Sequence, residues 1–331
     1  MTNIMSVKGK RVLVTGAGGF IGSHLTEALV RNGARVKAFV HYRGNGSSGW
    51  LDHSPLKGDM EIVAGDIADR DFVMGAMKGA DLVFHLAALI GIPYSYHAPS
   101  SYIRTNIEGT LNVLQSVRDL GVQRILHTST SEVYGTAQRV PMDEQHPLQG
   151  QSPYSACKIG ADKLAEAFYL SFQTPVVTIR PFNTFGPRQS ARAVIPTIIS
   201  QCLAGQTVRL GSLRPTRDFN YVSNTVDAFL RAAAADAAVG RTINVGSGSE
   251  ISIGDLVKKI GIIAGRNITV ETEESRFRPA GSEVDQLLAD NSQARKLLGW
   301  EPSLSLDEGL KKTFEWIREH LTEYRPGSYA V

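Results

Sequence analysis

Residues 11–24 read Arg-Val-Leu-Val-Thr-Gly-Ala-Gly-Gly-Phe-Ile-Gly-Ser-His, an apolar strand-like run that leads through glycines into a helical pattern. The first glycine of such a turn allows a sharp bend, the second lets backbone N–H groups approach a pyrophosphate, and the third lets helix and strand pack closely. The positive end of the following helix points at the phosphates. The stretch therefore predicts a dinucleotide site that includes Gly16, Gly19, Phe20, Ile21 and Gly22.

Length and composition are those of a globular enzyme. The chain has 331 residues, 42% hydrophobic and 20% charged, and a net charge of +3 that is too small to indicate nucleic-acid binding. Cys157 and Cys202 cannot form a disulfide framework, and no Cys/His cluster has metal-ligand spacing. Met1–Lys10 lacks the apolar core of a signal peptide, and the apolar run Ala80–Pro93 is too short to span a bilayer. We expect a cytoplasmic protein without metal, membrane or nucleic-acid partners.

Strand-like and helix-like stretches alternate along the first half, which predicts an α/β fold with a doubly wound parallel sheet of Rossmann type. The strand candidates are Arg11–Thr15, Arg35–Val40, Glu61–Val63, Leu82–His85, Arg124–Ser129 and Val176–Arg180. The helix candidates are Ile21–Asn32, Ser100–Leu120 and Pro153–Phe172, with stop or start signals at Gly33, Gly121 and Ser152.

This regularity ends after Arg180, where prolines and scattered arginines accumulate. The segment Phe219–Gly246 again resembles a helix and a strand that return to the sheet. We therefore expect a dinucleotide-binding domain of residues 1–180 and 219–246. A smaller, C-terminal substrate-binding lobe is expected from residues 181–218 and 247–331.

A group of polar residues indicates catalysis. Tyr154 and Lys158 are four residues apart and so share a helical face, where an ammonium lowers the pKa of a tyrosine toward the range of a general base. Thr130, Ser131 and Glu132 follow a predicted strand, at the sheet edge where ligands bind in open α/β folds. The alternatives are a solvated helix face for the Tyr/Lys pair and an exposed loop carboxylate for Glu132.

Taken together, these segments resemble an extended short-chain dehydrogenase/reductase of the nucleotide-sugar epimerase and 4,6-dehydratase group. The Thr-Ser-Glu-Val-Tyr-Gly run is similar to the dehydratases, and 86–97 and 187–196 look like the dehydratases of nucleotide-linked N-acetylglucosamine in legionaminic-acid type pathways. The matching motifs are Thr15–Gly22, Gly65–Ile67, His85–Ala88, Asn106–Thr110, Thr130–Gly135, Tyr154/Lys158, Arg180–Pro187, Arg217–Phe219 and Arg278-Pro279.

The resemblance implies a mechanism. Tyr154, helped by Lys158 and Thr130, takes the proton of the sugar C4 hydroxyl while a hydride passes to nicotinamide. Glu132 then removes the C5 proton, water leaves from C6, and the hydride returns to C6 to give a 4-keto-6-deoxy sugar. Ser131 stands where dTDP-glucose dehydratases carry an aspartic acid, although GDP-mannose-type dehydratases resemble this chain in having a serine there. The resemblance leaves the acid for C6 open, and one candidate is Glu132 itself, relaying the C5 proton.

The cofactor is expected to be tightly bound NAD(P). The second strand ends in His41-Tyr-Arg43 without the carboxylate that usually holds the NAD ribose, which slightly favours NADP with a 2′-phosphate against His41 or Arg43. The alternative for Arg43 is a loop residue without a ligand. The remaining cofactor contacts are expected from Asp66 and Ile67 at the adenine, from Leu86, Ala87 and Ala88 along the cofactor, and from Tyr154 and Lys158.

For the substrate, the family motifs imply that Arg217 and Arg278 bind the diphosphate, since arginine pairs in bidentate fashion with phosphate oxygens. Asn183 is expected to hold sugar or phosphate. Arg188 and Arg192 are expected to be solvated loop charges. His85 and His127, on apolar strands, are expected in the core.

Several functions fit this pattern. The leading interpretation is a 4,6-dehydratase acting on UDP- or GDP-N-acetylglucosamine. The alternatives are a 4- or 5-epimerase or a 5,6-dehydratase of the same superfamily, and a non-catalytic cofactor-binding regulator. The resemblance also implies a homodimer through the helices Ser100–Leu120 and Pro153–Phe172. The loop Arg43–Asp52 could extend it to a tetramer.

Overall fold

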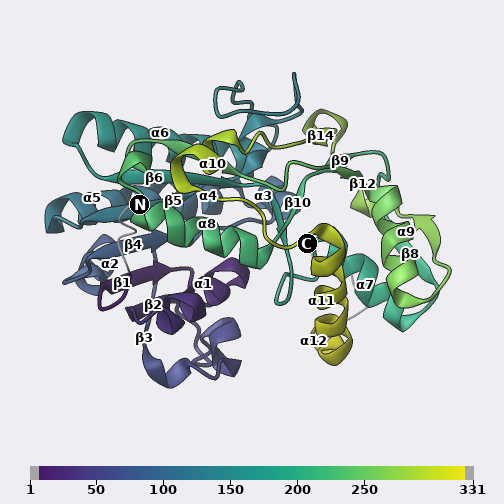
Figure 1. Cartoon of the computed structure of the whole chain (residues 1–331), viewed down its shortest axis with the longest axis horizontal. Coiled ribbons are helices and arrows are strands. Elements are labelled where there is room, and N and C mark those ends of the chain that lie inside the picture. Colours follow the sequence, from purple (N-terminus) through teal and green to yellow (C-terminus); the bar gives the residue numbers. More distant parts are fainter. Residues whose placement is uncertain (1–6, 325–331) are drawn as a thin grey trace.

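A computed structural model describes residues 7–324, so Met1–Ser6 of the predicted dinucleotide-binding domain and Arg325–Val331 of the predicted C-terminal lobe lie outside the described residues. Its centre is a seven-stranded parallel sheet in the order β11-β6-β5-β4-β1-β2-β3 (Figure 1). This order confirms the predicted doubly wound sheet. β1 lies inside the sheet, with β2 and β3 on one side of it and the later strands on the other. The strands are β1 (Arg11–Thr15), β2 (Arg35–His41), β3 (Met60–Gly65), β4 (Leu82–His85), β5 (Arg124–Thr128), β6 (Val176–Pro181) and β11 (Thr242–Val245).

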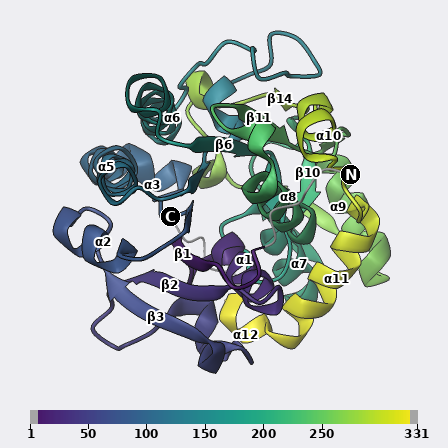
Figure 2. The same cartoon turned by 60° about the vertical axis from the view of Figure 1, so that its left-hand side comes forward.

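Helices cover both faces of this sheet (Figure 2). One face carries α1 (Phe20–Arg31) and α8 (Val222–Ala234), and the other carries α2 (Arg70–Met77), α5 (Gly109–Leu120) and α6 (Pro153–Phe172). The bounds of α6 are those predicted, because the Ser152 side chain accepts the N–H of Ser155 and closes a capping box.

The helix predicted over Ser100–Leu120 is interrupted. The chain passes from α4 (Pro99–Tyr102) through a π-helical turn, Ile103–Glu108, into α5. Within this turn Asn106 accepts the N–H of Leu89 at 2.8 Å and donates to its carbonyl at 2.9 Å. The wider turn thus holds the loop after β4, a common use of π-helical geometry beside functional sites.

Three small sheets and several helices form the remainder of the fold, and their apolar residues continue the core beneath α1 and α8. The strands pair as β7 (Asn183–Phe185) with β10 (Phe219–Tyr221), β8 (Thr207–Leu210) with β13 (Thr269–Thr272), and β9 (Thr216–Arg217) between β12 (Ile251–Ser252) and β14 (Gln286–Leu287). The helices are α3 (Ile92–His97), α7 (Val194–Ala204), α9 (Ile253–Ala264), α10 (Ser292–Leu298), α11 (Leu306–Glu319) and α12 (Leu321–Tyr324).

Candidate active site

One cleft at the carboxyl ends of the central strands brings the predicted site residues together. Its volume of about 1330 Å³ exceeds the roughly 300–1,000 Å³ of common ligand pockets, so it has room for a dinucleotide and a second ligand. Its lining includes Gly16, Gly19, Phe20, Ile21, Gly22, His41, Arg43, Asp66, Ile67, Leu86, Ala87, Ala88, Thr130, Ser131, Glu132, Tyr154, Lys158, Asn183, Arg217 and Arg278.

The glycine turn has the shape that a dinucleotide requires. Gly16 has φ +71°, and a Cβ there would lie 2.8 Å from the nitrogen of Ala87. A Cβ on Gly22 would lie 2.1 Å from the carbonyl oxygen of Gly16, so helix and strand touch at this point. Gly19 is the N-cap of α1 and offers no capping side chain, which leaves the first N–H groups of the helix open to an anion. These residues therefore fit a bound diphosphate.

Sequence reasoning missed two neighbours of this turn. Gly18 has no room for a side chain, because a Cβ would lie 2.3 Å from the carbonyl of Ser48. Asp52 reaches the cleft from a loop and accepts hydrogen bonds from Ser47, Ser48 and Lys57, which keep its pKa at about 2. Asp52 lies in the 3-10 helix Gly49–His53, beyond β2 in the sequence, so the end of that strand gave no signal for it.

The cofactor-lining loops are fixed by buried hydrogen bonds. The N–H groups of Leu86 and Ala87 both lie 3.2 Å from the Thr15 hydroxyl, which itself contacts His85 at 2.8 Å. This confirms His85 as a core residue, and burial lowers its pKa. Asp66 accepts the N–H of Ala68. His41, at the end of β2, and Arg43, just beyond it, are exposed.

Tyr154 and Lys158 lie side by side on α6 but do not have the electrostatics that we predicted. Burial raises the pKa of Tyr154, and a hydrogen bond with Thr130 lowers it only in part. Burial also lowers the pKa of Lys158, to about 8, and its Nζ donates to the carbonyl of Thr128 at 2.6 Å. The expected fall in the tyrosine pKa is therefore wrong for this structure, since desolvation of the buried phenolate outweighs the hydrogen bond from Thr130.

The residues after β5 form a 3-10 turn, Ser131–Tyr134, which we call the Glu132 turn. The Thr130 hydroxyl accepts the N–H of Glu132 at 3.2 Å and caps this turn. Glu132 is only 11% exposed, and its Oε2 lies 3.6 Å from Nη1 of Arg278. The alternative of an exposed loop carboxylate is therefore wrong, and Glu132 faces the cleft beside the Tyr/Lys pair.

The opposite wall presents cations and free polar atoms. Arg217 is buried, donates to the carbonyl of Thr216, and lies 3.4 Å from Glu283. Burial lowers its pKa, and the charge of Glu132 opposes that shift. The buried Oδ1 of Asn183 and Nη1 of Arg278 have no hydrogen-bond partner among residues 7–324. Unpaired polar atoms of this kind indicate a ligand site.

One loop residue contradicts our expectation. Arg188 is not a solvated charge: its side chain is 12% exposed, lines the cleft and pairs with Glu27 of α1 at 2.9 Å. The backbone at Arg188 is left-handed, with φ 70°. Arg192 is exposed as expected. Gln189, which the sequence did not single out, lines the cleft with a buried Oε1 that has no partner within the described chain.

Comparison with known proteins establishes the family. A family model described as GDP-mannose 4,6 dehydratase matches residues 13–313, so the chain belongs to this family of extended short-chain dehydrogenase/reductases. A UDP-glucose 4-epimerase of Mycolicibacterium smegmatis is 35% identical over 93% of this chain and 98% of its own length. A dTDP-glucose 4,6-dehydratase of Xanthomonas campestris pv. campestris is 32% identical over 94% of this chain and 93% of its own length.

The same relationship appears among solved structures. DesIV, a dTDP-glucose 4,6-dehydratase of Streptomyces venezuelae with NAD bound, has a TM-score of 0.87 and 27% identity, covering 95% of this chain and 99% of that one. The predicted resemblance and fold are thus confirmed, and relatives include dehydratases, epimerases and decarboxylases of nucleotide sugars.

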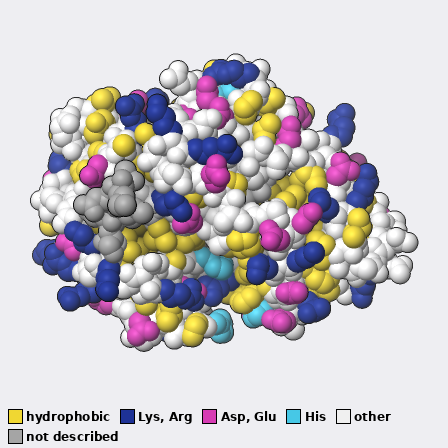
Figure 3. All heavy atoms as spheres, in the orientation of Figure 1, with side chains coloured by type: hydrophobic (Ala, Val, Ile, Leu, Met, Phe, Trp, Pro, Cys, Tyr) yellow, Lys and Arg dark blue, Asp and Glu magenta, His cyan; other side chains and the backbone are white. Residues whose placement is uncertain are grey.

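The surface adds two observations. Basic and acidic side chains are interspersed over the face shown in Figure 3. Between residues 7 and 324, no helix is both long and apolar enough to cross a bilayer.

Proposed function

We propose that the protein is a nucleotide-sugar 4,6-dehydratase that acts on UDP- or GDP-N-acetylglucosamine. The observation that carries this proposal is the position of Thr130, whose hydroxyl contacts both Tyr154 and the backbone N–H of Glu132. An oxidation base and a second carboxylate base are thereby held in one cleft. Removing a proton from C5 requires that second base, whereas inversion at C4 alone does not.

In the proposed reaction, Tyr154 accepts the proton of the C4 hydroxyl, with Thr130 orienting its phenol oxygen. A nicotinamide cofactor held by the glycine turn and by Leu86–Ala88 would supply the hydride chemistry that links C4 and C6. The raised pKa of Tyr154 requires a nearby cation to stabilise the phenolate, and Lys158 is placed to supply it. Glu132 takes the C5 proton and passes it to the leaving C6 hydroxyl, since Ser131 carries no acidic proton.

The substrate nucleotide is assigned to the lobe formed by 181–218 and 247–331. Arg217 and Arg278 would hold its diphosphate, with Asn183 beside them. The diphosphate then replaces Glu132 as the partner of Arg278 and frees the carboxylate for C5.

The cofactor is proposed to remain bound between turnovers, because a hydride that is stored and returned gives no reason for release. The exposed Arg43 beyond β2 leads us to propose NADP, although the related DesIV structure holds NAD. Mass spectrometry of the nucleotide released from purified protein tests this, and NAD alone would contradict it.

A homodimer through the helical segment 99–120 and α6 is proposed, with the loop 43–52 as a further contact in a tetramer. The exposed apolar side chains Ile103, Leu170 and Phe172 on these helices support it. Light scattering at micromolar concentration tests the dimer, and a monomer would contradict it. The free, buried Cys157 and Cys202 are compatible with the proposed cytoplasmic location.

The decisive experiment follows isotope in the reaction. In D2O, with UDP- or GDP-N-acetylglucosamine, the wild type should place solvent deuterium at C5 of a 4-keto-6-deoxy product and the C4 hydrogen at C6. Glu132→Gln keeps the shape of the side chain but removes the base, so reduced nicotinamide should accumulate without loss of water. A C4-inverted sugar without label at C5 would favour an epimerase instead.

A further inference from the structure

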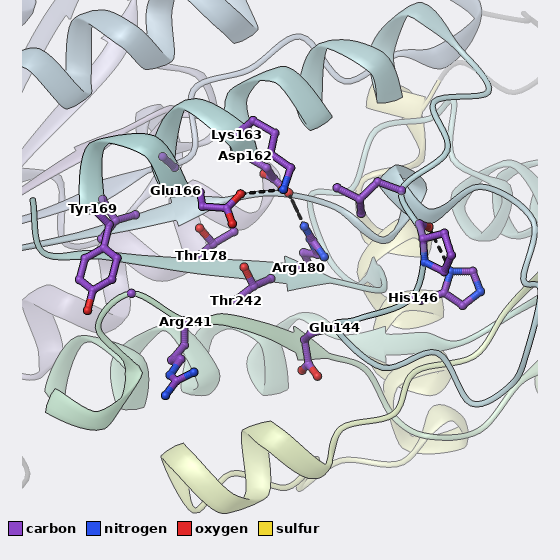
Figure 4. A pocket seen from close by; sticks show the side chains of 15 residues that line it. Glu144, His146, Asp162, Lys163, Glu166, Tyr169, Thr178, Arg180, Arg241 and Thr242 are labelled. Carbon is purple, nitrogen blue, oxygen red and sulfur yellow. Dashed lines mark hydrogen bonds and ion pairs between the residues drawn. The ribbon is translucent and has the colours of Figure 1, made fainter. Parts of the chain in front are cut away.

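A second cavity lies beneath α6, outside the cleft, and exposes the base of the catalytic helix (Figure 4). It has a volume of about 360 Å³ and is lined by α6, β6, the beginning of β11 and the loop 144–148. Lys163 and Glu166 pair at its rim, whereas Asp162 and Arg180 face each other at its floor. The proposed mechanism gives this buried ion pair no role.

Asp162 has an unusually complete set of donors. Its Oδ1 accepts from Nε2 of His127 at 3.1 Å, and its Oδ2 accepts from the Ser129 hydroxyl at 2.7 Å. Oδ2 also accepts from Nε and Nη2 of Arg180, at 3.1 and 2.9 Å. Burial alone would raise the pKa of Asp162, but its donors and the cations around it bring that pKa down to about 2. These donors and cations therefore stabilise the charged form of the carboxylate.

These bonds connect the two elements that carry the catalytic residues. Asp162 lies one helical turn beyond Lys158, on the same face of α6. Ser129 directly precedes Thr130, the residue that contacts Tyr154. Arg180 continues the chain by donating from Nη1 to the Tyr134 hydroxyl at 2.9 Å, and Tyr134 belongs to the Glu132 turn. A single carboxylate thus joins the helix of the oxidation base to the turn of the C5 base.

We propose that Asp162 is a positioning residue for the reaction: it holds the Tyr154/Lys158 face of α6 against the Glu132 turn and supplies the counter-charge for the Lys158 ammonium. This rests on the proposed function only in assuming that the sugar is first oxidised at C4. Asp162 lines the second cavity and is not among the residues that line the cleft.

The electrostatic part of this role has a definite sign. Beside Tyr154, whose phenol burial keeps protonated, the titratable groups around Lys158 are Cys157 and Asp162 on α6, His127 on β5 and His85 on β4. Burial keeps both histidines and the thiol neutral, so Asp162 is the anion among them. Its charge raises the pKa of Lys158, against the burial that lowers it. Removing the charge must make Lys158 lose its proton at a lower pH.

The test measures Lys158 directly in cofactor-loaded protein. Carbon-labelled lysine is titrated by NMR, and the Lys158 resonance is identified by its absence in Lys158→Met. In Asp162→Asn the midpoint should fall by about one pH unit relative to the wild type. Glu166→Gln removes the same charge one turn further along α6, at the solvent-exposed rim, and should leave the midpoint unchanged. An unchanged midpoint in Asp162→Asn overturns the proposal.

A second measurement covers the positional part and does not require Asp162→Asn to fold. Ser129→Ala removes one bond to Asp162 and leaves every charge in place. On mixing with UDP- or GDP-N-acetylglucosamine, its first-turnover formation of reduced nicotinamide should be roughly tenfold slower than that of wild type, with little change in substrate affinity. A rate equal to wild type counts against the proposal. If instead wild type forms no reduced nicotinamide with either sugar, the proposed function fails while the Lys158 titration still decides the role of Asp162.

Discussion

Two buried or part-buried arginines differ in their hydrogen bonding: Arg180 lines the second cavity beneath α6, and Arg278 lines the cleft. Arg180, at the end of β6, is buried, and all three of its guanidinium nitrogens donate to Asp162 or Tyr134. Arg278, in the second lobe, lies 3.6 Å from Glu132, and its buried Nη1 has no hydrogen bond within residues 7–324. Arg180 therefore uses its hydrogen bonds within the fold, whereas Arg278 has a nitrogen available to bind a ligand.

The same contrast extends to their surroundings. Near Arg180, Asn244 accepts the Tyr134 hydroxyl and donates to the carbonyl of Met142, so the polar chain beneath α6 ends in further bonds. In the cleft that Arg278 lines, the side-chain oxygens of Asn183 and Gln189 are buried and have no hydrogen-bond partner within residues 7–324. Because an unpaired buried polar group costs about 1–3 kcal/mol, the second region is more stable when a ligand completes it. Arg180 and Arg278 thus differ in the completeness of their hydrogen bonding, whereas elsewhere in the described chain Nε of Arg124 and Nδ1 of His127 are also buried without a partner.

Tyr154→Phe should have the largest effect. Tyr154 lines the same cleft as Arg278 but lies on α6, the helix whose Asp162 pairs with Arg180. The phenol is buried like a scaffold group, but its proposed work is proton transfer. The rate of reduced nicotinamide formation should fall about 10³-fold, the scale of a lost general base, while the unfolding temperature changes little. Stopped-flow absorbance and calorimetry measure the two quantities. A rate within about tenfold of wild type would place Tyr154 with the scaffold instead.

The two arginines should respond in opposite ways to replacement by methionine. Arg180→Met leaves the buried Asp162 without its cation and should cost about 3–5 kcal/mol in the free energy of unfolding. Arg278→Met should change that free energy by less than about 1 kcal/mol, because its ion pair is long and part-exposed. Arg278→Met should instead bind the nucleotide sugar at least roughly tenfold more weakly than the wild type.

Urea unfolding and titration calorimetry separate these outcomes. The comparison fails if Arg278→Met destabilises the protein as much as Arg180→Met, or if its affinity for the nucleotide sugar is unchanged.

A smaller effect, on the pH dependence of stability, is expected at His24, where α1 contacts the segment that follows β7. His24 of α1 contacts the carbonyl of Pro187 at 3.0 Å, and burial lowers its pKa from 6.5 to about 4. The unfolded chain therefore binds more protons between those values, and stability falls as pH drops from 6.5 toward 4. This contribution amounts to about 2–3 kcal/mol.

His24→Gln should reduce this acid sensitivity, and His53→Gln, at an exposed position, should not. Denaturant unfolding at pH values across this range measures the slope. Equal slopes in His24→Gln and wild type would show that His24 does not couple stability to pH.

The sequence predicted the sheet and most of the cleft, because both depend on local patterns. β1, β4 and α6 have the predicted bounds, since apolar runs, glycine stops and the Ser152 cap act within a few residues of themselves. The helices of the second lobe went unpredicted although α11 has a capping box of Ser305 and Glu308, a signal that could have been found.

Other features depended on contacts between distant segments, and the tertiary structure alone decided them. The pairing of Arg188 with Glu27 joins residues far apart in the chain, so a loop arginine gave no sign of its burial. The tyrosine pKa was predicted from the neighbouring lysine, but burial of both groups controls it. Short-range sequence patterns identified which residues could take part in binding and catalysis. Desolvation and long-range partners, which exist only in the folded chain, decided their charges and which of them remain free to bind a ligand.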